Sequence, residues 1–321
     1  MDNSRTSVLA GGLRALLDLG GYNFRAAGSP GGRAWLAALP SLVADLAREW
    51  ELTVTDGEIR HGYNAVVIRV ARAGVPLALK ITWPSGDDVR LEAEALAAWH
   101  GHGAVGLVAA DPARGALLLE RLGTGRSLAD VPVLEAGAIA GTVLRELAVP
   151  APESVPALRD QANWIASAFV ERRHQPDSQV PGDWLTLAAR LADALSRDPA
   201  RLLIHADLHY GNVLAREAPG ADDRGWVAID PRPLAGAPER SAAELLWTRA
   251  DELAAPEDFV RLLDAIIGGG GLVRGKAVAW SFVRTIDYWL WALDTGLTID
   301  PVRCARVAGA LAPLAARVTL A

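Results

Sequence analysis

The pattern of hydrophobic and polar positions divides the chain into a strand-rich first part and a helical remainder. Short apolar and β-branched runs are bounded by Asp56-Gly57 and Ala73-Gly74, dipeptides that favour hairpin turns. The runs lie at residues 52–54, 65–70, 77–81 and 116–122. They predict a twisted antiparallel sheet, preceded by an N-terminal helix over residues 33–50, where apolar side chains recur at helical spacing.

After residue 122 the apolar positions indicate helices that pack one face into a core. The predicted helices cover residues 134–148, 158–173, 183–197, 241–254, 257–267, 275–295 and 301–318. Gly268 to Gly271 predict a flexible break between two of these helices. The fold class is therefore α+β, with an N-terminal lobe over residues 1–122, including the helical extension, and a larger, mostly helical C-terminal lobe over residues 123–321.

The bulk properties are those of a globular protein that can bury a sizeable core, with 321 residues of which 51% are hydrophobic. No segment has the pattern of a signal peptide or of an 18-residue apolar span, so we expect a cytoplasmic protein with no membrane partner. Cys304 is the only cysteine, which excludes an intrachain disulfide and fits a reducing compartment. The net charge of −6 argues against a nucleic-acid partner. We expect a monomer that acts on a small molecule.

The segment from His205 to Asn212, His-Ala-Asp-Leu-His-Tyr-Gly-Asn, has the spacing of a kinase catalytic loop. Phosphoryl transfer needs a carboxylate that orients and deprotonates the attacking hydroxyl, and two oxygen ligands that hold Mg²⁺ on the triphosphate of ATP. Asp207 is the predicted catalytic base, and Asn212 supplies one metal ligand. Asp230 supplies the other, at the end of the apolar run 226–229. His205 is expected to order the loop, because Mg²⁺ prefers oxygen ligands.

Lysine occurs only twice in the chain. One of the two, Lys80, lies in the apolar run 77–81, before the helix that carries Glu92. An ammonium group is a compact point charge that can sit between phosphates and a carboxylate. Glu92 is the predicted carboxylate, because it shares a helix face with apolar residues at i+4 and i+7. Glu94 is the competing candidate, but it lies about 200° around the helix and is expected to be a solvated surface acid.

Two further segments complete the predicted nucleotide site. Gly62 allows close backbone approach in a loop over the phosphates, and Asn64 can donate to a phosphate oxygen, although a plain hairpin turn would have a similar sequence. The carbonyl of Glu120 and the amide of Leu122, at the end of the last strand, are the candidates for bonding an adenine. A buried strand end without ligand contacts is the alternative interpretation of that segment.

These residues resemble the aminoglycoside phosphotransferase superfamily and, within it, the streptomycin and hydroxyurea kinases. The likeness covers about residues 32–313 and rests on segments 32–35, 79–80, 99–105, 117–122, 205–212 and 228–231. His209 distinguishes it from protein kinases, which usually have Lys at that position. The resemblance implies a two-lobe protein-kinase-like fold, ATP and Mg²⁺, and an antibiotic hydroxyl as acceptor. Ala237 and Ser241 replace acids that the family usually has near the acceptor cleft.

The candidates for binding the acceptor are mostly acids and aromatics, which suit a cationic ligand. They are His209, Glu244, Asp287, Trp291 and Asp294. Tryptophan at helical spacing more often belongs to the core, which is the alternative for Trp291. The leading interpretation is an ATP-dependent O-phosphotransferase that acts on a cationic antibiotic, an aminoglycoside or a cationic peptide, and confers resistance. The alternatives are a metabolite or sugar kinase on the same fold, and a binding or immunity protein without catalysis.

Overall fold

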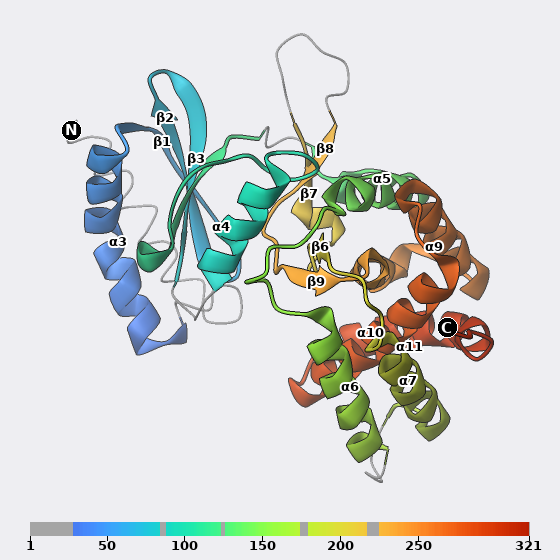
Figure 1. The fold of residues 1–321 in the computed structure, drawn as a ribbon. Coiled ribbons are helices and arrows are strands. Elements are labelled where there is room, and N and C mark those ends of the chain that lie inside the picture. Colours follow the sequence, from blue (N-terminus) through green and yellow to red (C-terminus); the bar gives the residue numbers. More distant parts are fainter. Residues whose placement is uncertain (1–27, 84–87, 123–125, 174–178, 217–224, 321) are drawn as a thin grey trace. The chain divides into compact units, whose positions relative to one another are not determined.

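The chain forms two compact units, each with its own core (Figure 1). The first comprises Met1–Gly101 and Val105–Arg121, and the second comprises His102–Ala104 and Leu122–Ala321. The computed structural model describes residues 28–83, 88–122, 126–173, 179–216 and 225–320.

The first unit is built on a five-stranded antiparallel sheet with the strand order β1-β2-β3-β5-β4. The strands are β1 (Leu52–His61), β2 (Ala65–Arg72), β3 (Val75–Thr82), β4 (Leu107–Asp111) and β5 (Ala116–Glu120). Two helices, α3 (Pro30–Glu49) and α4 (Asp88–Trp99), lie on opposite sides of the sheet (Figure 1). The helix α3 begins where the Ser29 side chain accepts a hydrogen bond from the amide of Gly32, which caps its first turn.

The core of this unit lies between α3 and one face of the sheet. Leu39 and Leu46 of α3 belong to one cluster with Leu79 and Ile81 of β3, and all four are fully buried. Successive side chains of a strand point to opposite faces, so Lys80, between two members of that cluster, points to the other face. The alternation of side chains along β3 thus places the ammonium group of Lys80 on the face of the sheet away from this core.

One predicted turn in this sheet is wrong. Asp56-Gly57 lies inside β1, where the pairing with β2 shifts register between Val54 and Ile59. A β-bulge absorbs extra residues without reversing the chain, and the reversal comes instead at residues 62–64. The second predicted turn, at Ala73-Gly74, is confirmed, because it joins β2 to β3 with both residues at positive φ.

The second unit is mostly helical, with two short antiparallel ribbons (Figure 1). Its helices are α5 (Val133–Leu147), α6 (Leu158–Arg172), α7 (Gly182–Leu195), α8 (Ala243–Trp247), α9 (Pro256–Gly270), α10 (Arg274–Asp294) and α11 (Asp300–Ala315). The ribbons pair β6 (Leu202–Ile204) with β9 (Leu234–Gly236), and β7 (Val213–Ala215) with β8 (Trp226–Ala228). Within the described ranges, no helix is both long and apolar enough to cross a membrane.

Two predicted helix boundaries in this unit are wrong. The helix expected over residues 241–254 is divided into a 3-10 turn at Pro238–Ala242, the short α8, and a second 3-10 turn at Ala250–Glu252. Of the four glycines expected to break the chain, Gly268 to Gly270 instead continue α9, and Gly271, with a φ of 61°, ends it. A Cβ on Gly269 would lie 2.2 Å from a backbone oxygen of α5, so the small residue serves close helix packing rather than flexibility.

Candidate active site

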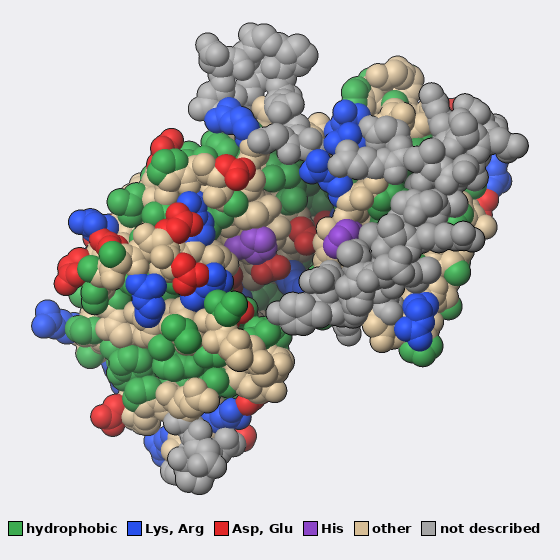
Figure 2. Space-filling view, turned by 180° about the vertical axis from the view of Figure 1, so that it is seen from behind, with side chains coloured by type: hydrophobic (Ala, Val, Ile, Leu, Met, Phe, Trp, Pro, Cys, Tyr) green, Lys and Arg blue, Asp and Glu red, His purple; other side chains and the backbone are tan. Residues whose placement is uncertain are grey.

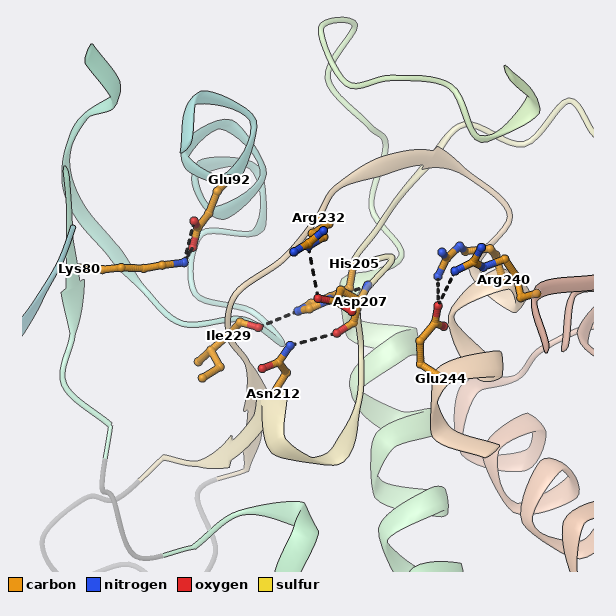
Figure 3. Close-up of polar contacts among 10 residues, drawn as sticks. Lys80, Glu92, His205, Asp207, Asn212, Ile229, Arg232, Arg240 and Glu244 are labelled. Atoms are coloured by element: carbon orange, nitrogen blue, oxygen red, sulfur yellow. Dashed lines mark hydrogen bonds and ion pairs between the residues drawn. The ribbon is translucent and has the colours of Figure 1, made fainter. Parts of the chain in front are cut away.

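The catalytic loop joins β6 to β7 and is organised around the buried side chain of His205 (Figure 3). Its Nε2 lies 2.9 Å from the carbonyl oxygen of Ile229, and its Nδ1 accepts a hydrogen bond of 3.3 Å from the amide of Asp207. Burial lowers the pKa of His205 to about 4, so the ring is neutral and carries its proton on Nε2. A neutral ring with both nitrogens bonded to backbone orders the loop, as the sequence predicts.

Asn212 and Asp230 are held close to the same loop by backbone hydrogen bonds. The Nδ2 of Asn212 donates to the carbonyl oxygen of Asp207 at 3.0 Å, and the amide of Ile229 donates to the carbonyl oxygen of Asn212 at 2.9 Å. The amide nitrogen of Asn212 is therefore engaged, which leaves its side-chain oxygen to face a cation. Asp230 is exposed and has a φ of 59°, an uncommon conformation for a residue other than glycine.

Asp207 is partly exposed, and its carboxylate faces Arg232 (Figure 3). The Nε of Arg232 lies 3.4 Å from Oδ2 of Asp207. Burial raises the pKa of Asp207 to about 6, an effect that Arg232 opposes and that the negative charges of Glu244 and Asp230 reinforce. A carboxylate with a pKa close to neutrality is suited to general-base catalysis.

The donor set formed by Asn212 and Asp230 fits Mg²⁺, because it consists of oxygen atoms alone. Among the described residues, no group of three or more His, Cys, Asp or Glu side chains could hold a metal ion. Mg²⁺ in kinases is held by one or two protein oxygens together with the phosphates of the substrate. The two residues thus fit an ion that arrives with a nucleotide rather than a resident metal.

The predicted pair of Lys80 and Glu92 lies within the first unit. The Nζ of Lys80 lies 2.7 Å and 2.8 Å from the two carboxylate oxygens of Glu92, and both side chains are more than nine-tenths buried. Glu94, the competing candidate, instead forms a partly exposed ion pair with Arg90 at 2.7 Å. The helix-face argument therefore chose between the two acids correctly.

The predicted phosphate loop is the connection between β1 and β2. The amide of Gly62 donates to the carbonyl of Ala65 at 3.0 Å, and the carbonyl of Asn64 accepts from the amide of Trp83 at 2.8 Å. The role of the Asn64 side chain as a donor to a phosphate stays a prediction. Apart from Gly62 itself and its two chain neighbours, no atom of the described residues lies within 4 Å of where a Cβ on Gly62 would be, so protein packing does not require glycine there.

The predicted adenine contacts lie at the end of β5. The amide of Glu120 donates to the carbonyl of Gly106 at 2.8 Å, and its side chain accepts from the amide of Gly106 at 3.1 Å. Leu122 follows and is buried. Gly123, the glycine expected to end this stretch, lies outside the described residues. The adenine-binding role of Glu120 and Leu122 stays a prediction.

The predicted acceptor acids are all paired with arginine. Glu244 lies 2.7 Å from Arg240 and 3.4 Å from Arg284, and the latter also pairs with Asp287. Two arginines and two acids give this cluster no net charge. Asp294 pairs with Arg172 in the same way. Basic and acidic side chains are also interspersed on the molecular face shown in Figure 2.

The remaining two acceptor candidates differ in exposure and partners. Trp291 is 52% exposed and stacks on Tyr288, with ring centroids 5.3 Å apart, and Tyr288 in turn stacks on Trp247 at 4.8 Å. The ring is thus half in solvent, not a core residue. His209 caps the short 3-10 turn at 210–212 by accepting a hydrogen bond from the amide of Gly211 at 3.2 Å.

Sequence reasoning gave no role to three arginines at this site. Arg240 and Glu244 are four residues apart, and Arg284 and Asp287 are three apart, so helical spacing could have revealed both pairs. Arg232 comes from a loop 25 positions after Asp207, and no local pattern signals that contact.

Comparison with known proteins places this site in a family. Residues 49–296 match the model for the aminoglycoside/hydroxyurea antibiotic resistance kinases. A streptomycin 6-kinase of Streptomyces glaucescens is 36% identical over 286 residues, which are 84% of this chain and 88% of that protein. A hydroxyurea phosphotransferase of Kitasatospora aureofaciens is 36% identical over 290 residues, which are 88% of this chain and 82% of that protein.

Solved structures confirm the predicted two-lobe, kinase-like α+β fold. A thermostable mutant of aminoglycoside phosphotransferase APH(4)-Ia, in a ternary complex with AMP-PNP and hygromycin B, aligns with a TM-score of 0.56 and 16% identity over 86% of this chain and 98% of that one. An ethanolamine kinase of Plasmodium vivax aligns with a TM-score of 0.54 and 14% identity over 84% of this chain and 83% of that one. These identities support the fold alone. The match along residues 49–296 and the similarity to the two bacterial phosphotransferases show that this chain belongs to the aminoglycoside/hydroxyurea antibiotic resistance kinase family.

Proposed function

We propose that this protein transfers the γ-phosphoryl group of ATP to a hydroxyl of a small antibiotic, and that it does so with Asp207 as the catalytic base. The observation that carries the proposal is the state of Asp207. Burial raises its pKa to about 6, and its loop is fixed by a neutral His205 and by Asn212. A base poised near neutral pH on an ordered loop is what proton abstraction from a hydroxyl requires.

The other polar groups of the site bind and orient the nucleotide. Asn212 and Asp230 would hold Mg²⁺ through their side-chain oxygens, where the ion would supply positive charge against the phosphates. Lys80 is fixed by Glu92 and donates to phosphate oxygens. Its burial and its two short contacts set the ammonium group in one place before the nucleotide arrives, so little reorganisation accompanies binding.

The loop at Gly62 and the end of β5 supply the remaining contacts to the phosphates and the adenine. The loop at Gly62 has open space at its Cα, which allows close approach of a phosphate, and Asn64 donates from its side chain. The carbonyl of Glu120 and the amide of Leu122 bond the adenine edge. Because these two contacts use backbone groups, changing the side chain of Glu120 or Leu122 should affect nucleotide affinity weakly.

Streptomycin is the acceptor that we propose first, because two of its named kinases are 36% and 35% identical to this chain over most of its length. The charge of the acceptor candidates does not add to this choice. Glu244, Asp287 and Asp294 are each compensated by arginine, so a neutral acceptor such as hydroxyurea suits them as well. The half-exposed ring of Trp291 offers a flat surface for a sugar or cyclitol ring.

Mass spectrometry with a small panel tests the proposal. Streptomycin, hydroxyurea, hygromycin B and ethanolamine are each incubated with MgATP and the purified protein, and the Asp207→Asn variant is run in parallel. We expect one of the three antibiotics to gain the mass of one phosphoryl group with the native protein and far less with the variant. Phosphorylation of ethanolamine alone would favour the metabolite-kinase alternative. Binding of MgATP with no phosphorylated product from any compound would refute the antibiotic assignment.

A further inference from the structure

Arg232 occupies a rigid position beside the catalytic carboxylate. Its amide donates to the carbonyl oxygen of His205 at 2.9 Å, which ties its backbone to the catalytic loop. Pro231 and Pro233 flank it and fix the backbone dihedral angles on either side. The guanidinium is thus presented from a backbone that is held at both ends.

The contact between Arg232 and Asp207 is loose. Nε lies 3.4 Å from Oδ2, whereas a charge-assisted hydrogen bond between such groups is about 2.7–2.9 Å long. The side chain of Arg232 is 73% exposed. Within the described part of the chain, its guanidinium makes no hydrogen bond or other ion pair, so the terminal N–H groups are available to another anion.

The charges around the loop indicate which anion Arg232 could bind. Asp207 and Asp230 are both acidic, and a phosphoryl group that reacts here adds further negative charge. Arg240, the other cation that acts on Asp207, is fully buried and bound to Glu244. Arg232 is the exposed cation of this loop, and the planar fork of arginine matches two oxygens of a phosphoryl group.

We propose that Arg232 is a further catalytic residue that leaves Asp207 and binds the oxygens of the transferring phosphoryl group. This inference rests on the proposed function. In the step concerned, the bond between the γ-phosphorus and the bridging oxygen breaks, and its electron pair stays on the ADP oxygen. A bond forms between the γ-phosphorus and the acceptor oxygen, and the hydroxyl proton passes to Asp207. Arg232 donates hydrogen bonds throughout and neither gains nor loses a proton.

The competing explanation is that Arg232 only positions Asp207. The two roles differ in what they predict for a phosphoryl mimic that forms no bond to Asp207. Calorimetry is used to measure MgADP binding with and without aluminium fluoride, which imitates the planar phosphoryl group. The proteins are the native enzyme, Arg232→Gln and Arg232→Lys. Arg261→Gln serves as the matched control, because Arg261 is also an exposed arginine paired with an aspartate, Asp258, on helix α9.

We expect aluminium fluoride to tighten MgADP binding in the native enzyme and in Arg261→Gln. Arg232→Gln should lose at least about tenfold of that tightening while its affinity for MgADP alone stays within about twofold, since electrostatic groups aimed at the transition state act only there. Arg232→Lys should lose less, because it keeps the charge but not the fork. Equal tightening in native and Arg232→Gln, or no tightening in the native enzyme, would overturn the proposal.

A double-mutant cycle with Asp207→Asn gives a second, independent test. Its readout is basal hydrolysis of MgATP, in which water is the acceptor, so no antibiotic needs to be identified. If Arg232 binds the phosphoryl group, Arg232→Gln lowers the rate by about the same factor, roughly 10²-fold or more, in both backgrounds. If Arg232 acts only through Asp207, Arg232→Gln should leave the rate of hydrolysis almost unchanged once Asp207 is Asn, so that the factor is about one. A failure to phosphorylate any antibiotic would refute the proposed function but leave both of these readouts intact.

Discussion

The molecule contains two ion pairs that are alike in chemistry and opposite in construction. Lys80 and Glu92 are both buried and meet through two contacts of 2.7 Å and 2.8 Å. Arg232 and Asp207 meet through one contact of 3.4 Å, with 73% and 35% of their side chains exposed. The first pair is a fixed mount for a cation, whereas the second can separate at little cost. A cation beside a carboxylate is therefore structural or exchangeable according to burial and geometry, not residue type.

The energetic contrast follows from solvation. Breaking a buried ion pair leaves an uncompensated charge away from water, which costs roughly 3–5 kcal/mol. An exposed pair contributes about 0–1 kcal/mol, because water solvates both partners once they separate. The loose pair can therefore exchange its partner during turnover, and the buried pair cannot. Each of the following predictions tests one side of this difference.

The largest effect on activity is expected from Asp207→Asn, which removes the charge of the loose pair but keeps the shape of the side chain. General-base contributions are typically about 10²–10⁴-fold, so kcat should fall by that order while MgATP affinity stays nearly unchanged. Because burial raises the pKa of Asp207, its ionised form destabilises the folded state near neutral pH, and the Asn variant should unfold at the same or a higher temperature.

Calorimetric nucleotide binding, turnover with the best acceptor, and thermal unfolding measured side by side check this prediction. Native turnover in the Asn variant would contradict the assignment of Asp207 as the base. Loss of MgATP binding by a folded variant would instead move Asp207 into the set of metal ligands.

The buried pair should respond in the opposite way. Glu92→Ala leaves the ammonium of Lys80 buried without its carboxylate, so the free energy of unfolding should fall by about 3–5 kcal/mol along with activity. The double variant Lys80→Met with Glu92→Leu removes both charges, and we expect it to recover most of the stability but none of the activity. Denaturant unfolding and ATP turnover separate the two outcomes. Recovery of turnover in the double variant would show that Lys80 does not act on the nucleotide.

Lys80→Arg tests whether the buried site needs a point charge. The guanidinium is wider than the ammonium group and cannot reproduce both contacts to Glu92 in the same space. Turnover should fall more than about tenfold with the fold intact, because the charge is kept but displaced. Circular dichroism controls for folding, and an unchanged rate of ATP turnover would rule out the phosphate-binding assignment.

The sequence predicted those parts of the site that depend on local spacing. The catalytic loop is contiguous, so Asp207 and Asn212 could be recognised as one motif. Helix periodicity selects Glu92 over Glu94. The choice of Glu92 was correct because the helical period on which it depends lies within a single element.

The parts that could not be predicted depend on contacts between elements. The contact of Arg232 with Asp207 joins two loops, and no periodicity links them. Gly269, near the end of α9, looks like part of a break, but its close contact with the neighbouring helix α5 needs its small size. The dipeptide Asp56-Gly57 has the composition of a turn, yet pairing with β2 continues past it. In each case tertiary packing overrode a local preference.

The pH dependence of catalysis offers a finer test of the loose pair. The carboxylate of Asp207 must be ionised to accept a proton, and burial raises its pKa to about 6 from an unfolded value near 4. Between these two pH values the folded protein binds a proton that the unfolded chain has lost, so this group's contribution to stability disappears as the pH rises through 6. Activity moves the other way, and kcat/KM should rise toward a plateau above pH 6.

Arg232→Gln should shift the acid limb of the pH profile, which is the pH range over which kcat/KM rises toward its plateau. The positive charge of Arg232 opposes the effect of burial on the pKa of Asp207, so its removal should move the limb to higher pH. A kcat/KM profile between pH 5 and 8 for the native and variant enzymes measures the displacement. A limb that moves to lower pH, or one that does not move, would mean that the two side chains do not interact in the free enzyme.

The smallest effect is the one expected from Arg232→Gln on stability. It gives the sharpest contrast between the Arg232–Asp207 pair and the Lys80–Glu92 pair. Three-quarters of the Arg232 side chain is in water and its contact with Asp207 is long, so the free energy of unfolding should change by no more than about 0.5 kcal/mol. Arg261→Gln, which removes another exposed arginine from its pair with an aspartate, should change it by a similar amount. Denaturant unfolding of both variants beside Glu92→Ala makes the test. A loss of several kcal/mol in Arg232→Gln would show that the pair is a structural fixture like Lys80–Glu92, and an arginine so committed could not move to a phosphoryl group.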